Sequence, residues 1–250
     1  MPNVPKPHTG RRRVPKASTA PSETAYETSA GRYPRGARRK RETRARLLEA
    51  AFGLVAQKGI DSVTINEITE AADVGFGSFY NHFESKEGIF TALVEWLFEE
   101  FANTLDRLAS GLADPAEVIA VSVRHTLLRA YREPVWGQLL IREGLSPRAL
   151  SRGLGQRLLR DSDRGISERR FAVGDQLMCL VSVVGTVLAG IAAEMHFADS
   201  SRRTVRARKM LRSREERFAQ RTAAIVLQAF GIRRVEAETI ARRPLPAGPD

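Results

Sequence analysis

The sequence feature that most constrains the fold is a series of closely spaced signals for helix starts and stops in the N-terminal third of the chain. Apolar residues recur every three or four positions over residues 38–58, which predicts a helix, and Gly59 is a typical left-handed stop after it. The segment TINE, residues 64–67, forms a capping box that begins a second helix. Asp73 tolerates a positive φ in the following turn, and a third short helix is expected over residues 75–82. Two short helices joined by a tight turn, with a longer helix on each side, predict a helix-turn-helix.

The remainder of the chain also carries helical patterning, so the predicted fold class is all-α. Apolar spacings of three and four predict a long amphipathic helix over residues 89–108 and further helices up to about residue 231. The sequence shows no strand alternation and no internal repeat. The expected divisions are a disordered basic arm (1–36), a helix-turn-helix domain (37–84), a helical domain (85–241) and a flexible tail (242–250).

Positive charge is concentrated at the N-terminal end. The net charge is +11, and residues 1–46 carry 13 Lys and Arg side chains against three acidic ones, whereas the rest of the chain is nearly balanced. Such a basic arm is typical of proteins that contact a polyanion, either nucleic acid or an anionic membrane surface. A solvated tail without a specific partner has the same composition, so the charge alone leaves both interpretations open.

The sequence lacks the motifs of the common enzyme classes. His125 and His196 have no assignable catalytic partner, and no Gly-rich phosphate loop, GxSxG or HExxH motif occurs. The single cysteine, Cys179, excludes a disulfide framework and a multi-cysteine metal site. The first residues have no apolar run typical of a secretory signal. We therefore expect a cytoplasmic protein that is not an enzyme and that holds neither a cofactor nor a metal.

The segment VTINEITEAADVGFGSFYNHFESKE, residues 63–87, resembles the DNA-binding domain of the tetracycline-repressor (TetR) family. The helix over residues 38–58 is similar to that family's first helix in length and offset, so the resemblance covers about residues 38–95. It implies a helical ligand-binding and dimerisation domain after the helix-turn-helix. It also implies a homodimeric, sequence-specific transcriptional regulator, most often a repressor, which binds a near-palindromic operator in double-stranded DNA and is released by a small-molecule effector. The alternative is an architectural protein that uses its basic arm to bind DNA without sequence preference.

The resemblance assigns roles to residues of the helix-turn-helix. The residues expected to face the major groove are those at the start of the recognition helix, and Gly77 among them would let the backbone approach DNA closely. Asn66 would reach a base or a phosphate. The groove-facing residues are Phe76, Gly77 and Ser78, the phosphate-contacting residues are Thr64, Tyr80, Asn81, His82 and Lys86, and Gly75 at the start of the helix is a further DNA-binding candidate.

Three positions depart from the family pattern, and two arginines have two possible roles. The family more often has glycine where this chain has Asp73, and a Ser or Thr cap where it has Gly75. Phe76 stands where polar residues are frequent, so base reading at this position would be apolar. Arg41 and Arg44, early in the first helix, would contact phosphate or the minor groove, or would form a solvated helix start.

The C-terminal half is expected to hold the dimer interface. Residues 176–193 are uncharged and long enough for a membrane span, but their polar and glycine residues favour a buried helix in a soluble bundle, without a membrane partner. By the resemblance, the helices at 175–197 and about 213–231 would pair with their mates in the partner subunit. The residues of the last helix expected to face the core are Phe218, Ile225, Ala229 and Phe230. The basic segment 201–217 has no functional interpretation beyond a solvated insertion.

A ligand pocket is expected between the helices of residues 115–195. Ordinary core packing is the favoured alternative for each candidate lining residue, and Cys179 is expected to be an inert buried thiol because apolar residues surround it in sequence. The candidates are His125, Tyr131, Trp136, Met178 and Cys179.

Overall fold

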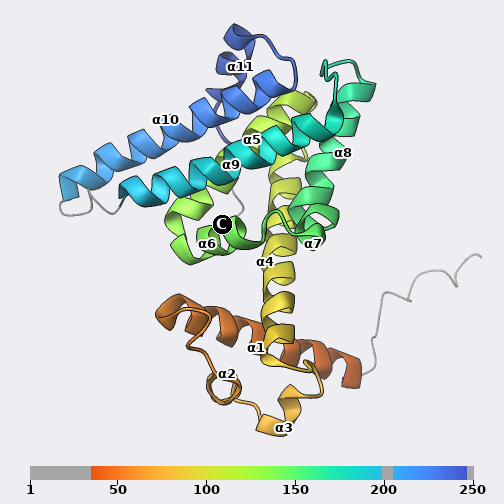
Figure 1. Ribbon diagram of the computed structural model, residues 1–250, viewed down its shortest axis with the longest axis vertical. Helices are drawn as coiled ribbons and strands as arrows, with labels where there is room; N and C mark the ends of the chain where they lie inside the picture. The colour runs from red at the N-terminus through yellow and green to blue at the C-terminus, as the bar shows by residue number, and fades with distance from the viewer. Residues whose placement is uncertain (1–34, 199–204, 247–250) are drawn as a thin grey trace, which may run out of the picture. The chain divides into compact units, whose positions relative to one another are not determined.

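The computed structural model describes residues 35–198 and 205–246 of the chain. Every regular element within these residues is an α-helix, which confirms the predicted fold class (Figure 1). The chain divides into two compact units, residues 1–41 and 42–250. The expected basic arm lies outside the described residues except for its last positions, and the helix-turn-helix and the helical domain both belong to the second unit.

Local capping explains the boundaries of the first three helices, α1 (Arg35–Lys58), α2 (Ile65–Ala71) and α3 (Phe76–Phe79). Gly59 has φ 80° and Asp73 has φ 52°, so both residues take the left-handed conformation that the sequence predicted. The Thr64 hydroxyl accepts a hydrogen bond from the Glu67 N–H at 3.4 Å, and the Glu67 carboxylate accepts one from the Thr64 N–H at 2.9 Å. The predicted capping box is therefore present.

The third helix is shorter than the expected residues 75–82. It ends at Phe79, and the chain continues in turns because the backbone N–H groups of His82 and Phe83 both donate to the Phe79 carbonyl, at 2.9 Å. This tightening places both phenylalanine side chains in the core, where Phe79 is 0% exposed and Phe83 is 5% exposed. The helix thus ends at a buried residue, without a helix-stop signal in the sequence.

Five helices form the first part of the helical domain. The Ser85 hydroxyl accepts from the Gly88 N–H and caps α4, and Asp114 caps α5 with Pro115 in the first turn, as the sequence predicted. Helix α4 packs against α5, α7 and α8. The bounds of these helices are α4 (Lys86–Ala109), α5 (Pro115–Arg132), α6 (Pro134–Glu143), α7 (Pro147–Ser151) and α8 (Gly153–Ser167).

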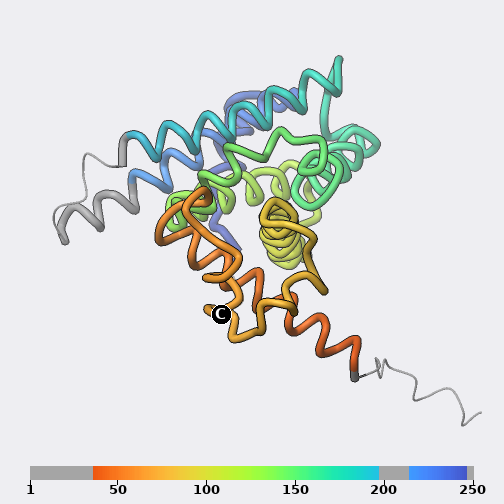
Figure 2. The backbone as a smooth tube through the Cα atoms, turned by 60° about the horizontal axis from the view of Figure 1, so that its bottom comes forward, coloured from red at the N-terminus to blue at the C-terminus, as the bar shows by residue number. Residues whose placement is uncertain are grey.

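The last helices are α9 (Gln176–Ala198), α10 (Val205–Ala229) and α11 (Arg234–Ala241). Helices α9 and α10 run side by side in both views (Figures 1 and 2). Helix α10 begins at Val205 rather than at about residue 213, so the described part of the basic segment 201–217 is helical. The backbone carbonyl of Arg243, within the expected flexible tail, accepts a hydrogen bond from the buried Arg124 at 2.6 Å.

Helix α9 is only partly buried, which corrects the expected buried helix. It is long and apolar enough to cross a membrane by length and composition, with mean hydropathy 2.0 over Gln176–His196, but only 22% of that window is buried. One face packs against α5, α6 and α10, while Leu177 and Val181 on the other face are 70% and 52% exposed. Ile225 and Ala229 of α10, which were expected to face the core, are also exposed.

Candidate nucleic-acid interface and ligand cavity

The exposed surface of the helix-turn-helix is centred on α3. Phe76 is 50% exposed and Tyr80 is 51% exposed, although both carry large aromatic rings. The other residues that the sequence assigned to this segment are exposed or half-buried, and they are Gly75, Gly77, Ser78 and Asn81. The residues expected to read DNA therefore occupy one accessible segment of the chain, as a groove-reading element requires.

Buried aromatic rings hold this segment in place. The fully buried Phe79 ring lies 5.6 Å from the Phe83 ring, measured between centroids. The Tyr80 ring meets Phe76 at 5.5 Å and Phe79 at 5.4 Å, both in edge-to-face geometry. Because such contacts favour defined ring orientations, Tyr80 connects the exposed Phe76 ring to the core beneath it.

Arg44 and His82 brace the base of the recognition segment. The Arg44 guanidinium donates to the His82 carbonyl at 3.4 Å and lies 4.4 Å from the centroid of the Phe83 ring. The His82 ring is tilted against Phe83 at a centroid distance of 6.4 Å. Both side chains are half-buried, so each has a packing role in addition to the phosphate contact that the resemblance implies. Arg41 is exposed, and its guanidinium Nε donates to the Ala37 carbonyl at 3.4 Å.

The N-terminus of α2 is occupied by its own capping groups. The Thr64 hydroxyl donates to the Glu67 carboxylate at 2.7 Å, and Lys58 forms an ion pair with the same carboxylate. The Lys58 hydrogen bond and then the Thr64 hydrogen bonds lower the pKa of Glu67 from 4.5 to about 2. A phosphate at Thr64 would therefore meet a charged carboxylate, whereas the exposed Asn66 side chain lies outside this cap.

Lys86 has an intramolecular acceptor at the start of α4. Its Nζ donates to the Asp61 carbonyl at 2.9 Å and lies 5.8 Å from the centroid of the Phe90 ring. The side chain is half-buried. The implied phosphate contact of Lys86 would share the ammonium group with this backbone carbonyl, which a three-donor ammonium allows.

A largely apolar cavity lies among the helices of the second domain. Its volume is about 120 Å³, and residues of α4 to α9 line it. Apolar walls come from Phe98 and Leu105 on α4, Val123 on α5, and Val183 and Val187 on α9. Apolar walls with a few polar groups are typical of small-molecule sites.

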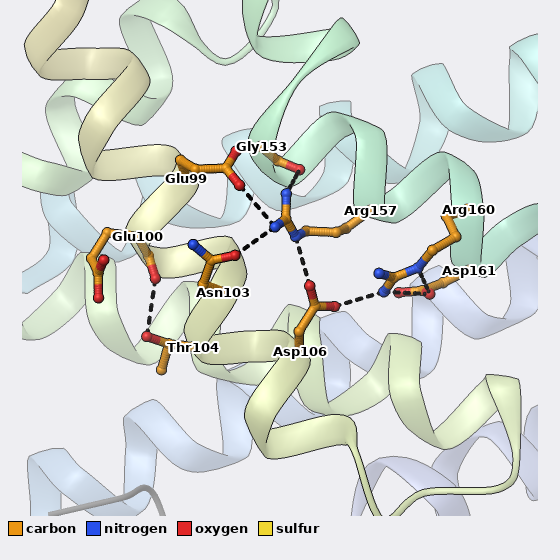
Figure 3. Close-up of polar contacts among 9 residues, drawn as sticks. All are labelled: Glu99, Glu100, Asn103, Thr104, Asp106, Gly153, Arg157, Arg160 and Asp161. Atoms are coloured by element: carbon orange, nitrogen blue, oxygen red, sulfur yellow. Dashed lines mark hydrogen bonds and ion pairs between the residues drawn. The ribbon is translucent and has the colours of Figure 1, made fainter. Parts of the chain in front are cut away.

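The cavity lining includes three charged residues, Asp106, Arg157 and Asp161, and Figure 3 shows the polar contacts that they make. Arg157 of α8 donates to the Asp106 carboxylate of α4 at 2.8 Å, and Arg160 donates to the same carboxylate at 2.7 Å and to Asp161 at 2.8 Å. Burial alone would raise the pKa of Asp106, but the hydrogen bonds from Arg160 and Arg157 outweigh burial and lower that pKa. Asp106 is therefore a carboxylate at neutral pH, and it can accept a hydrogen bond from a ligand hydroxyl.

Two further α4 side chains complete the polar contacts of Arg157. Its guanidinium donates to Glu99 at 2.8 Å and to Asn103 at 2.6 Å. Hydrogen bonds to Asp106 and Glu99 outweigh burial and raise the pKa of Arg157. Arg157 thus joins α8 to three acceptors on α4, the helix that follows directly after the helix-turn-helix.

Among the described residues, the cavity lining includes none of the five residues that the sequence suggested for a ligand pocket. Trp136 is fully buried against Phe101, with ring centroids 4.9 Å apart, and the half-buried His125 has a pKa lowered first by burial. Tyr131 is half-buried on α5. Met178 is 56% exposed on α9.

Cys179 is buried, and its thiol lies 3.4 Å from the Ala229 carbonyl. Burial raises the pKa of this thiol, which agrees with the expected inert cysteine. Sequence reasoning missed the charged residues of the cavity. The spacing of Arg157 and Asp161 places them on one face of a helix and could have revealed them.

Two family models match the chain. The model described as "Bacterial regulatory proteins, tetR family" matches residues 47–93, and the model "Tetracyclin repressor-like, C-terminal domain" matches residues 114–243. The second match alone spans more than half of the chain. Together the two matches cover the helix-turn-helix and the helical domain.

Solved structures and curated proteins are also similar to the chain. The crystal structure of RolR in complex with the ligand resorcinol is 35% identical, covers 85% of this chain and 100% of that chain, and has a TM-score of 0.65. The transcriptional repressor KstR2 of Mycobacterium tuberculosis (strain ATCC 25618 / H37Rv) is 34% identical over 73 residues, which are 28% of this chain and 36% of KstR2. The repressor DhaR of Mycobacterium sp. (strain GP1) is 35% identical over 95 residues, which are 38% of this chain and 46% of DhaR. The chain thus spans less than half the length of these two curated relatives.

Proposed function

Because the chain belongs to the tetracycline-repressor family of transcriptional regulators, we propose that it is a cytoplasmic homodimeric repressor, which binds a near-palindromic operator and is released by a small ligand. The observation that carries this proposal is the accessible recognition segment, residues 75–81, which buried aromatic rings hold in place. A duplex can receive such a segment in its major groove.

The exposed face of α9 supports a dimer. Large apolar side chains of Leu177, Met178 and Val181 are each more than half exposed there, and Ile225 of α10 is 55% exposed. A contiguous apolar face on a soluble protein is costly unless a partner covers it. A second copy of the chain would bury the face in a two-fold interface and would present two recognition segments to one duplex.

The cavity supports a small hydroxylated aromatic ligand. Its apolar walls would bury a ring, and Asp106 and Arg157 offer an acceptor and a donor to ring hydroxyls. RolR, whose crystal structure contains resorcinol, is similar along its whole length. Helix α4 lines the cavity and follows directly after the helix-turn-helix. If a ligand binds better when α4 is displaced, it would change the distance between the two recognition segments of a dimer and lower operator affinity.

The first test is selection of duplexes from a random library by the purified protein. We expect a near-palindrome to be enriched and to be protected from nuclease by a protein that light scattering identifies as a dimer. Bound DNA without any enriched sequence would favour the architectural alternative. Absence of DNA binding would refute the proposed function itself.

Variants of the recognition segment test its placement. Replacing Tyr80 by Phe and Asn81 by Ala removes two expected phosphate contacts and keeps the Tyr80 ring against Phe76. We expect operator affinity to fall while its salt dependence stays close to that of the wild type, because the two removed groups carry no charge and so do not change the number of counterions released. The matched control is Val235→Ala on α11, a residue that is 79% exposed. Equal affinity of the double variant and the control would contradict the assignment.

Resorcinol is the probe for the cavity. We expect it to bind in calorimetry and to release the protein from the operator, and we expect Asp106→Asn to weaken both effects. The control is Glu238→Gln, which removes one partner of surface ion pairs on α11. Binding of resorcinol that is identical in the Asp106 variant would place the ligand elsewhere.

A further inference from the structure

The geometry points to Phe76 as the residue that reads the 5-methyl group of one thymine in each operator half-site. This inference rests on the proposed DNA-binding function and adds a base preference to it. Phe76 is the first residue of α3 and is half exposed, whereas Phe79 on the same helix is completely buried. The two rings therefore have different environments within one helical turn.

The glycines beside Phe76 are not explained by the fold of the chain itself. Neither Gly75 nor Gly77 has φ in the left-handed region that favours glycine. A Cβ on Gly77 would have no described atom within 4 Å, and one on Gly75 would meet only the Ser78 hydroxyl at 4.0 Å. Packing and backbone conformation would therefore accept residues with side chains at both positions. Because both residues are glycines, Phe76 is the side chain that projects from this part of the surface.

The chemistry of the major groove selects the base. Adenine, guanine and cytosine present hydrogen-bond donors and acceptors there, and thymine adds a methyl group. A phenyl ring cannot replace the hydrogen bonds that polar base edges make with water, so contact with them costs free energy. Contact with a thymine methyl instead removes two apolar surfaces from water.

Tyr80 supports the Phe76 ring by an edge-to-face contact. Its ring lies at an interplanar angle of 76° to Phe76 and 80° to the buried Phe79. A ring that is already supported loses less conformational freedom when it binds, and this lowers the entropic cost of association. Tyr80 also contacts Phe79, which belongs to the core, so the support extends from Phe76 to the interior of the domain.

The test is a methyl scan of the operator selected by the purified protein. Each thymine is replaced in turn by deoxyuridine, which lacks only the 5-methyl group, and dissociation constants are measured by fluorescence anisotropy. We expect one symmetric thymine pair at which the wild type loses about fourfold in affinity per methyl group, which corresponds to ~0.8 kcal/mol. At that pair, removal of the methyl group should lower the affinity of the Phe76→Ala variant less than twofold. The Phe76→Leu variant keeps an apolar side chain, so removal of the methyl group should lower its affinity by an intermediate factor.

Controls separate this inference from the function on which it rests. Val235→Ala should show the wild-type methyl dependence, and circular dichroism verifies that each variant is folded. If the wild type binds its operator but no thymine depends on its methyl group, or if Phe76→Ala keeps the full dependence, the inference is wrong and the proposed function stands. If the protein enriches no operator, the proposed function itself fails.

Discussion

Replacing Gly77 by alanine should stabilise the protein and weaken operator binding. The free protein has room for the added methyl group, because no described atom lies within 4 Å of the new Cβ, and the φ of Gly77 lies outside the left-handed region. Alanine in a helical position is favoured over glycine by about 0.5–1 kcal/mol. In a protein of this size the melting temperature should rise by about 1–4 °C.

The same methyl group should oppose DNA binding. Where two surfaces are closely packed, an added methyl group costs about 1–3 kcal/mol, which is about 5- to 150-fold in affinity for each half-site. The assay pairs thermal unfolding with anisotropy titrations of the selected operator. Gly53→Ala in α1 is the matched control, since it is also a helical glycine with no described atom within 4 Å of the added Cβ.

The substitution should raise the melting temperature and lower the operator affinity, so unfolding cannot explain both effects. Loss of DNA binding through unfolding would lower the melting temperature, whereas steric exclusion from DNA leaves the fold at least as stable as before. The Gly53 variant should gain stability and keep wild-type affinity. A Gly77 variant that is stabilised and binds the operator as tightly as the wild type would refute the close approach of α3 to DNA.

Three further predictions concern the dimer face, the cavity and the helix cap. Leu177→Asp should convert the dimer to a monomer in light scattering and abolish operator binding, because it places a charge in the apolar face, while Val235→Asp should change neither. Asp106→Asn should lower the melting temperature at neutral pH, and the difference should shrink below pH 3.8, because a carboxylate with a lowered pKa stabilises the fold above its unfolded pKa and loses this effect as it is protonated. Glu67→Gln should destabilise the protein at pH 7, and melting curves should converge with those of the wild type as the pH falls from 4.5 to about 2; a constant difference over that range would contradict the assigned carboxylate contacts.

The sequence predicted features that depend on neighbouring residues. Gly59, Asp73 and the capping box of Thr64 and Glu67 are each defined within a few positions, and the structure confirms all of them. The end of α3 was not predictable in this way. The helix ends at Phe79, a residue that the fold buries completely, and no local stop signal marks this position.

The contacts around the cavity also could not be predicted from local sequence patterns. Arg157 contacts α4 residues more than 50 positions away in sequence, so local patterns cannot identify its partners. Met178 illustrates a second limit. Helix α9 is apolar around most of its circumference, so periodicity does not reveal which face packs inside, and Met178 lies on the exposed one.

The different environments of Phe79 and Phe76 within α3 have an evolutionary consequence. Phe79 secures the segment to the core, while Phe76 projects outward with open space at the flanking glycines. If Phe76 reads a base as proposed, a mutation at this outward position would alter which promoters the protein recognises, at a folding cost limited to its contact with Tyr80. New regulatory targets could be acquired by single amino-acid changes, whereas the inward position is restricted to residues that fill the same volume.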